Sequence, residues 1–148
     1  MLVKKILDDF CACYTPVGTI IYVGDTDEKW AYFEKDQLTT LGVVVEEHGK
    51  MPDVVVYHRA KKWLVLIEAV TSHGPVNPKR HAELKRLFDK AKVGLVFVTA
   101  FLDRKTLNKY LGDIACLGGC RGAMGIAGGL RHVKPQPFCP FLATAGVL

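Results

Sequence analysis

Residues 53–68, DVVVYHRAKKWLVLIE, decide the fold class of this chain. Two nearly continuous apolar runs, 54–57 and 63–67, flank a short polar stretch in this segment. Such runs are typical of strands that are covered on both faces, and a short polar link between them favours antiparallel pairing. The segment therefore predicts a β-hairpin that is symmetric about Ala60 and Lys61.

Helical and strand-like patterns continue on both sides of this hairpin. After Pro78, apolar residues at spacings of three and four mark one face of a helix, and Asn77 can cap its first turn. The expected helices are 2–13, 34–41, 78–91 and 107–114, and the further expected strands are 19–23, 30–33, 43–45 and 95–98. This order of elements places the chain in the α/β class, with a mixed β-sheet flanked by helices.

Composition limits the classes of protein to which the chain can belong. Its 148 residues suffice for one compact domain, and 49% hydrophobic with 24% charged residues is an ordinary globular balance. The formal charge of +5 fits a polyanionic partner. No apolar run is long enough to span a membrane and the first residues do not resemble a signal peptide, so we expect a cytoplasmic protein. The five cysteines are expected to be reduced thiols rather than a zinc site.

Two carboxylates stand at the ends of the apolar strands. Asp53 opens one strand and Glu68 closes the other, so a symmetric hairpin sets them opposite each other on one face of the sheet. Like charges at that spacing repel, and either a shared proton with a raised pKa or a hard cation such as Mg²⁺ relieves the repulsion. The alternative is that both carboxylates are solvated or paired with Lys50 or Arg80.

A polar loop and a basic helix start follow Glu68. Residues 71–75, TSHGP, leave the strand, and Lys79, Arg80 and His81 fall in the first turn of the next helix. Cations at this position oppose the helix dipole, so they gain most by facing carboxylates, a metal-bound water or a phosphate. A solvated surface turn is the alternative.

The segments around these carboxylates resemble a known nuclease signature. Pro52-Asp53, a hairpin and then Glu68-Ala69-Val70 is similar to the PD-(D/E)xK pattern. Four longer strings, which together lie within roughly residues 1–115, closely resemble the C-terminal catalytic region of the BsuBI/PstI restriction endonuclease family. They are YVGDTDEKWAYF, EEHGKMPDVVVY, WLVLIEAVTSHGPVNPKRHAELKRLF and LVFVTAFLDRKTLNKYLGDIA.

This resemblance implies a restriction-endonuclease-like fold and a type II site-specific deoxyribonuclease that cleaves double-stranded DNA in a restriction–modification system. Asp53 and Glu68 would hold Mg²⁺, which activates water and neutralises charge on the scissile phosphate. Enzymes that cut palindromic sites usually act as dimers, so a homodimer is expected.

The position of the signature lysine is occupied by Val70, so another cation must act near the attacking water. Lys79 is the first choice, because its helix starts just beyond the loop that leaves Glu68, and Lys50 is the second. The residues expected to contact DNA or phosphate are Lys50, His73 and Arg80, and the possible additional acidic ligands are Asp25, Glu46 and Glu47.

The last part of the chain, 116–148, departs from the family. It is rich in Gly, Pro and Cys and has no acidic residue. Codons for Cys116 to Cys120 can be read in the next frame as Ala-Trp-Glu-Ala, the kind of string with which the family would continue. We therefore divide the chain into a nuclease core, 1–115, and an aberrant tail of frameshifted origin. We expect no continuous sheet strand in the tail packed as the family's last strand would be, but an irregular segment or one that is ordered by contacts with a second copy of the chain.

Two other functions stay open at this point. The family's proteins carry a long N-terminal region, so the chain is alternatively a catalytically impaired DNA-binding or oligomerisation remnant. A third reading is a small-molecule hydrolase or phosphate binder that uses Asp25 in the Gly24-Asp25-Thr26 turn, although Asp is common in turns for local reasons.

Overall fold

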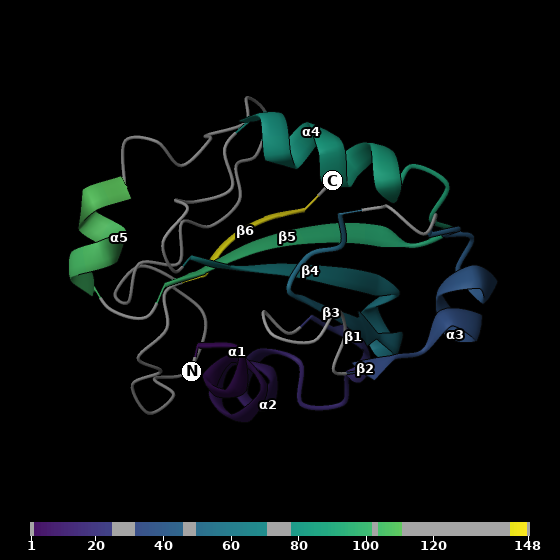
Figure 1. Ribbon diagram of the computed structural model, residues 1–148. Helices are drawn as coiled ribbons and strands as arrows, with labels where there is room; N and C mark the ends of the chain where they lie inside the picture. Colours follow the sequence, from purple (N-terminus) through teal and green to yellow (C-terminus); the bar gives the residue numbers. More distant parts are fainter. Residues whose placement is uncertain are drawn as a thin grey trace.

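The computed structural model describes residues 2–24, 32–45, 50–70, 78–101, 104–110 and 143–147. These residues build one six-stranded sheet with the strand order β2-β1-β3-β4-β5-β6 (Figure 1). The strands are β1 (Thr19–Val23), β2 (Tyr32–Phe33), β3 (Val54–His58), β4 (Trp63–Val70), β5 (Gly94–Phe101) and β6 (Ala143–Val147). Only β4 and β5 pair in parallel, so the sheet is mixed, as expected for this α/β chain.

The central hairpin has the register that the sequence predicts. Pairs run from Val54 opposite Ile67 to His58 opposite Trp63, so residue numbers across the ladder are symmetric about Ala60 and Lys61. A 3₁₀ turn, η2 (Arg59–Lys61), joins the strands, and Lys62 closes it with a positive φ of 53°. Extending the same register by one step places Asp53 opposite Glu68.

Helices cover the two faces of the sheet (Figure 1). One face carries the N-terminal helical segments, and the other carries the long helix that follows β4. The helices are α1 (Leu2–Lys5), a π-helical segment η1 (Ile6–Cys11), α2 (Ala12–Tyr14), α3 (Lys35–Thr40), α4 (Pro78–Leu87) and α5 (Arg104–Tyr110). Among the described residues, no helix combines the length and apolarity that a bilayer-spanning segment needs.

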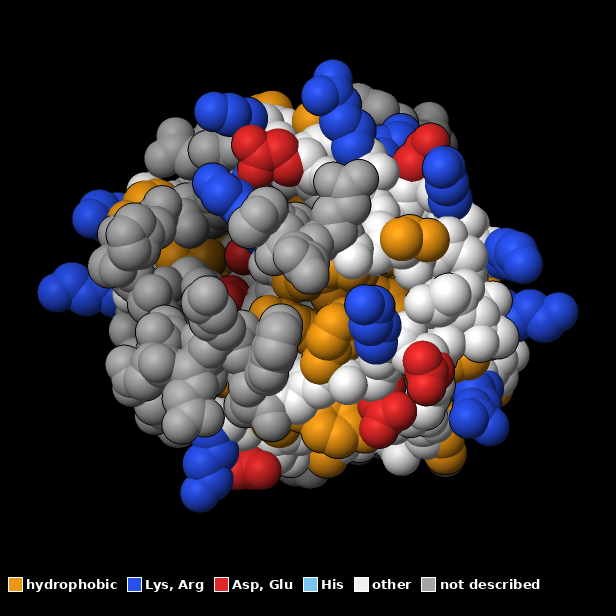
Figure 2. All heavy atoms as spheres, turned by 45° about the vertical axis from the view of Figure 1, so that its right-hand side comes forward, with side chains coloured by type: hydrophobic (Ala, Val, Ile, Leu, Met, Phe, Trp, Pro, Cys, Tyr) orange, Lys and Arg blue, Asp and Glu red, His pale blue; other side chains and the backbone are white. Residues whose placement is uncertain are grey.

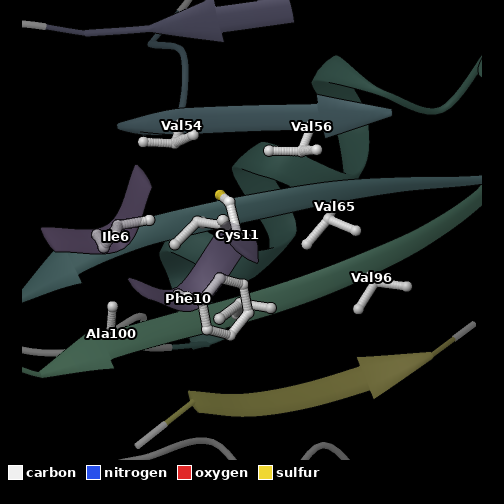
Figure 3. Close-up of a cluster of buried hydrophobic side chains, with 10 residues drawn as sticks. Ile6, Phe10, Cys11, Val54, Val56, Val65, Val96 and Ala100 are labelled. Carbon is white, nitrogen blue, oxygen red and sulfur yellow. The ribbon is translucent and has the colours of Figure 1, made fainter. Parts of the chain in front are cut away.

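Strand residues alternate between two buried clusters, one on each face of the sheet. The first cluster joins Ile6 and Phe10 of η1 to Val54, Val56 and neighbouring strand residues (Figure 3). The second joins side chains of the opposite face to α4 and the turn that follows it, and includes Val55, Leu64, Leu66, Leu84 and Phe88. Burial on both faces explains why β3 and β4 read as continuous apolar runs.

Two local expectations are wrong in detail. The region 2–13 is helical, but its middle is a π-helix rather than a regular α-helix, and this places Ile6, Phe10 and Cys11 together against the sheet. Val43 to Val45 form no strand. Val43 is buried while Val44 is 68% exposed, because the segment leaves α3 through Gly42, whose φ is +89°, and pairs with none of the described strands.

The tail contributes an unexpected strand. Residues 143–147 form β6, which pairs antiparallel with β5 at the edge of the sheet, so the expectation of no continuous strand after residue 115 is wrong there. The physical reason is that ladder hydrogen bonds use backbone groups, so a short segment of small and β-branched residues can cover the free edge of β5 whatever its origin. Residues 111–142 lie outside the described part of the chain, and the division at residue 115 and the frameshift stay predictions.

Candidate active site

The two carboxylates lie on the α4 side of the sheet. Glu68 is two residues beyond Leu66 in β4, so its side chain leaves the strand on the face that Leu66 shares with Leu84 of α4. Asp53 directly precedes β3, two residues before Val55 of the same face. The hairpin register and strand alternation therefore bring both carboxylates to one edge of the buried core.

Asp53 is fixed by a backbone hydrogen bond from the neighbouring strand. The Ala69 N–H donates to its Oδ2 at 2.6 Å, which ties the segment before β3 to the end of β4. Burial raises the pKa of Asp53 above its ordinary value, and this hydrogen bond and the charge of Arg80 only partly offset it. The site therefore holds a carboxylate whose charge costs free energy in the folded protein.

Glu68 is fixed by an arginine from α4. Arg80 donates from Nε at 2.9 Å and from Nη2 at 2.5 Å, both to Oε1 of Glu68, and the two side chains are about one-fifth exposed (21% and 18%). Burial raises the pKa of Glu68; Arg80 opposes this effect, whereas the negative charge of Asp53 adds to it. The pairing with Arg80 that we considered from sequence is thus present for Glu68.

The carboxylates keep one oxygen each for a further partner. Within the described part of the chain, Oδ1 of Asp53 and Oε2 of Glu68 accept no hydrogen bond. Among the described residues, these two partly buried carboxylates have one neighbouring guanidinium, and such a pair fits a hard cation that also keeps water ligands. Among the described residues, no group of three or more His, Cys, Asp or Glu is placed to hold a metal.

The sequence of the chain matches a known family over most of its length. The family described as the BsuBI/PstI restriction endonuclease domain matches residues 1–118. The chain belongs to this family.

Relatives agree with this assignment. Over 114 residues the chain is 54% identical to the type II restriction enzyme BsuBI of Bacillus subtilis, and over 121 residues it is 31% identical to the type II restriction enzyme AplI of Arthrospira platensis. Both alignments cover 77% of this chain, and 36% and 37% of the two relatives. The solved SdaI restriction endonuclease superposes with a TM-score of 0.70 at 40% identity, over 76% of this chain and 35% of that one. The chain thus spans little more than a third of the length of these proteins.

The place of the signature lysine in this member of the BsuBI/PstI family is closed to a charged side chain. Val70 is only 2% exposed and packs with Phe101 and Tyr110. An ammonium group there would be buried among apolar side chains, at a large cost in free energy. This position of β4 therefore has no room for the lysine of the signature.

The two candidate lysines differ in how the structure presents them. Lys79 is exposed on α4, on the outward side that also carries Glu83 and Arg86, and it makes no described contact with either carboxylate. Lys50 is also exposed, but its carbonyl oxygen accepts a hydrogen bond from Arg80 Nη1 at 3.1 Å. The structure therefore connects the backbone of Lys50 to the site through Arg80. Lys79 is the residue before Arg80 on α4.

Of the other predicted site residues, the structure describes Arg80, and the rest lie outside the described ranges. Arg80, expected at phosphate, points its guanidinium at Glu68 and at two backbone carbonyls, so contact with DNA stays a prediction for it. The predicted residues that lie outside the described ranges are His73, Asp25, Glu46 and Glu47.

Two polar neighbours of the carboxylates were missed from sequence. Thr99 on β5 is aligned with Glu68 and is 4% exposed. Burial and the charge of Asp53 raise the pKa of Tyr22 on β1, so its phenol stays protonated beside that carboxylate. A lone polar residue inside the apolar run 94–101 was a usable signal for Thr99, whereas the position of Tyr22 depends on the pairing of β1 with β3.

The imidazole of His81 lies against β5. Its ring packs on Phe97 with the centroids 4.3 Å apart. Burial, and then the nearby charge of Lys85, lower the pKa of His81, so it is neutral near pH 7. The first turn of α4 therefore presents its cations through Lys79 and Arg80.

Proposed function

We propose that this chain is the catalytic domain of a type II restriction endonuclease, which hydrolyses phosphodiester bonds in double-stranded DNA with Mg²⁺. The observation that supports it is the pair of partly buried carboxylates, Asp53 and Glu68, each with one oxygen held by the protein and one that accepts no hydrogen bond from the described residues. In a member of the BsuBI/PstI family, this pair is where a divalent cation and a scissile phosphate would meet.

Each side chain has a defined task in this proposal. Asp53 and Glu68 hold the cation through their free oxygens, and when bound the cation supplies positive charge to the scissile phosphate and acidifies a water. Lys79 orients the attacking water or accepts its proton, with Lys50 as the second candidate. Lys50, His73 and Arg80 would contact phosphate groups of the DNA.

The partners and location follow from the same proposal. Lys and Arg side chains are scattered over the face in Figure 2, and the formal charge is +5. The positive net charge suits contacts with the phosphates of a duplex. We further propose a homodimer, as a palindromic target requires two equivalent sites, and the cytoplasm as the place of action.

Nicking of supercoiled plasmid tests the proposed function. We expect the chain to nick plasmid with Mg²⁺ but not with Ca²⁺, and Asp53→Asn and Glu68→Gln to lower the rate by about 10²-fold or more. Asp89→Asn is the matched control, because Asp89 is exposed beyond the end of α4 and its change removes the same charge.

Two results would contradict the proposal. Wild-type protein that leaves plasmid intact with Mg²⁺, yet still binds duplex DNA, would support the catalytically impaired remnant instead. Equal nicking by the wild type and Asp53→Asn would mean that hydrolysis comes from other residues or from a contaminant.

A further inference from the structure

Arg80 is largely buried at the site and makes several hydrogen bonds there. Its guanidinium donates four hydrogen bonds to described residues: two to Glu68, one from Nη2 to the Met51 carbonyl at 3.0 Å, and one from Nη1 to the Lys50 carbonyl at 3.1 Å. A weaker ion pair joins Nη1 to Glu83 at 3.7 Å on the same helix. The side chain is 21% exposed, so most of the group is inside the fold.

These bonds connect three segments that are distant in sequence. They run from the first turn of α4 to the end of β4 and to residues 50–51, which lead into Asp53. The carbonyls of 50 and 51 lie before β3 starts, so they lack ladder partners from the sheet and are satisfied by the guanidinium. The planar fork of arginine suits this work, since it offers five donors in fixed directions, whereas lysine offers a single point charge.

The same bonds also select which oxygen of Glu68 remains available. Both Nε and Nη2 donate to Oε1, so Oε2 is left without a described hydrogen bond. On the other carboxylate, the Ala69 N–H holds Oδ2 of Asp53 and leaves Oδ1. A pair of carboxylates that are fixed through one oxygen each offers a cation a preformed two-oxygen site.

We propose that Arg80 is a positioning residue for the Mg²⁺ site, which clamps the segment before Asp53 to Glu68 and so preorganises the two carboxylates. The proposal rests on the proposed function, because it assigns the cation to this carboxylate pair. It differs from the phosphate role in that Arg80 acts before any DNA is bound. Arg80 therefore raises the affinity for the cation, although it carries a like charge.

Calorimetric titration with Mg²⁺ alone tests this role without DNA or catalysis. We expect Arg80→Met to weaken Mg²⁺ binding by about 10-fold or more, the scale on which partners of metal ligands act. Arg80→Lys keeps the charge but cannot bridge Glu68 and both carbonyls, so its loss should be intermediate. Arg86→Met is the matched control, because Arg86 is exposed on α4 and the change removes the same charge away from the site.

Hydrogen exchange of the Ala69 amide gives a second readout. This amide should exchange faster in Arg80→Met, because Asp53 is no longer tethered through residues 50–51, and Arg86→Met should leave it unchanged. If Arg80→Met fails to fold, Arg80→Lys decides by the same measurements.

Several outcomes would overturn the proposal. Mg²⁺ affinity equal to that of the wild type in both Arg80 variants would show that the clamp is dispensable. Tighter Mg²⁺ binding by Arg80→Met would mean that the guanidinium competes with the cation, and a rise in KM for DNA alone would assign Arg80 to phosphate. Failure of the proposed function is distinguishable, because the wild type and Asp53→Asn would then bind Mg²⁺ equally weakly.

Discussion

At the scale of single residues, the ionised carboxylates of Asp53 and Glu68 cost free energy in the folded protein. The pKa of Asp53 is raised mainly by burial, which means that the folded state holds its proton more tightly than the unfolded chain does. Stability is therefore lost as pH rises through the titration range of this carboxyl group, and the loss is complete above its folded pKa. Glu68 adds to this effect, because each negative charge disfavours the other.

Asp53→Asn should consequently stabilise the Mg²⁺-free protein near neutral pH. The amide oxygen can still accept the Ala69 N–H, while the buried charge is gone. We expect a gain of roughly 0.5–2 kcal/mol in the free energy of unfolding, the usual range for a stabilising substitution. Thermal unfolding at several pH values measures it, and the gain should shrink at acid pH. A variant less stable than the wild type at pH 7 would show that the ionised carboxylate stabilises the fold.

The identity of the working lysine is a second question at this scale. Lys79→Ala should lower kcat by about 10²-fold or more, which is typical of losing a general acid–base group, and Lys50→Ala should have a milder effect. Both side chains are exposed, so neither change should shift the free energy of unfolding by more than about 0.5 kcal/mol. Single-turnover cleavage measures the rates. An active Lys79→Ala protein beside an inactive Lys50→Ala protein would assign the role to Lys50.

At the scale of elements, α4 is the piece that connects the core to the site. Leu84 and the following Phe88 are buried against the face of the sheet formed by Val55 and Leu66. One turn before Leu84, Arg80 reaches Glu68. The packing of this helix therefore determines where the guanidinium lies.

Leu84→Ala should weaken both the packing of α4 on the sheet and the positioning of Arg80. Loss of a fully buried leucine typically costs about 2–5 kcal/mol in the free energy of unfolding. Because the helix loses its anchor four residues from Arg80, Mg²⁺ affinity of the folded fraction should also fall. Denaturant unfolding and Mg²⁺ titration measure the two effects, with exposed Lys85→Ala as control. Unchanged Mg²⁺ affinity despite the lost stability would separate the position of Arg80 from this packing.

At the scale of the whole molecule, the sequence predicts the fold better than it predicts the site. The hairpin register follows from the two apolar runs and their symmetry about Ala60 and Lys61, because the short link between the strands fixes which residues pair. The fork of Arg80 could not be predicted, since it depends on carbonyls of residues 50–51 that carry no side-chain signal. The hydrogen bond from the Ala69 N–H to Asp53 could not be predicted either, because its donor is a backbone group.

Strand β6 is the other feature that the sequence did not indicate. The segment 143–147 is short and small-residue-rich, and its pairing with β5 is visible only once the edge of β5 is known to be free. Because the family matches only residues 1–118, this edge is covered by a part of the chain that lies outside the match. A tail of frameshifted origin would thus have gained a structural role through backbone pairing alone.

Proline substitutions in β6 test whether the tail completes the sheet. Along an edge strand, successive N–H groups point alternately to the neighbour and to solvent, and proline removes this donor. One of Thr144→Pro and Ala145→Pro should therefore break a ladder bond to β5, and we expect that variant to be less stable by about 1–3 kcal/mol than the other. Val98 and Thr99 pair with these positions, and the one of the two whose N–H points to β6 should exchange faster in the same variant. If both variants exchange and unfold like the wild type, the tail does not pair with β5 in solution, and the nuclease core ends its sheet at that strand.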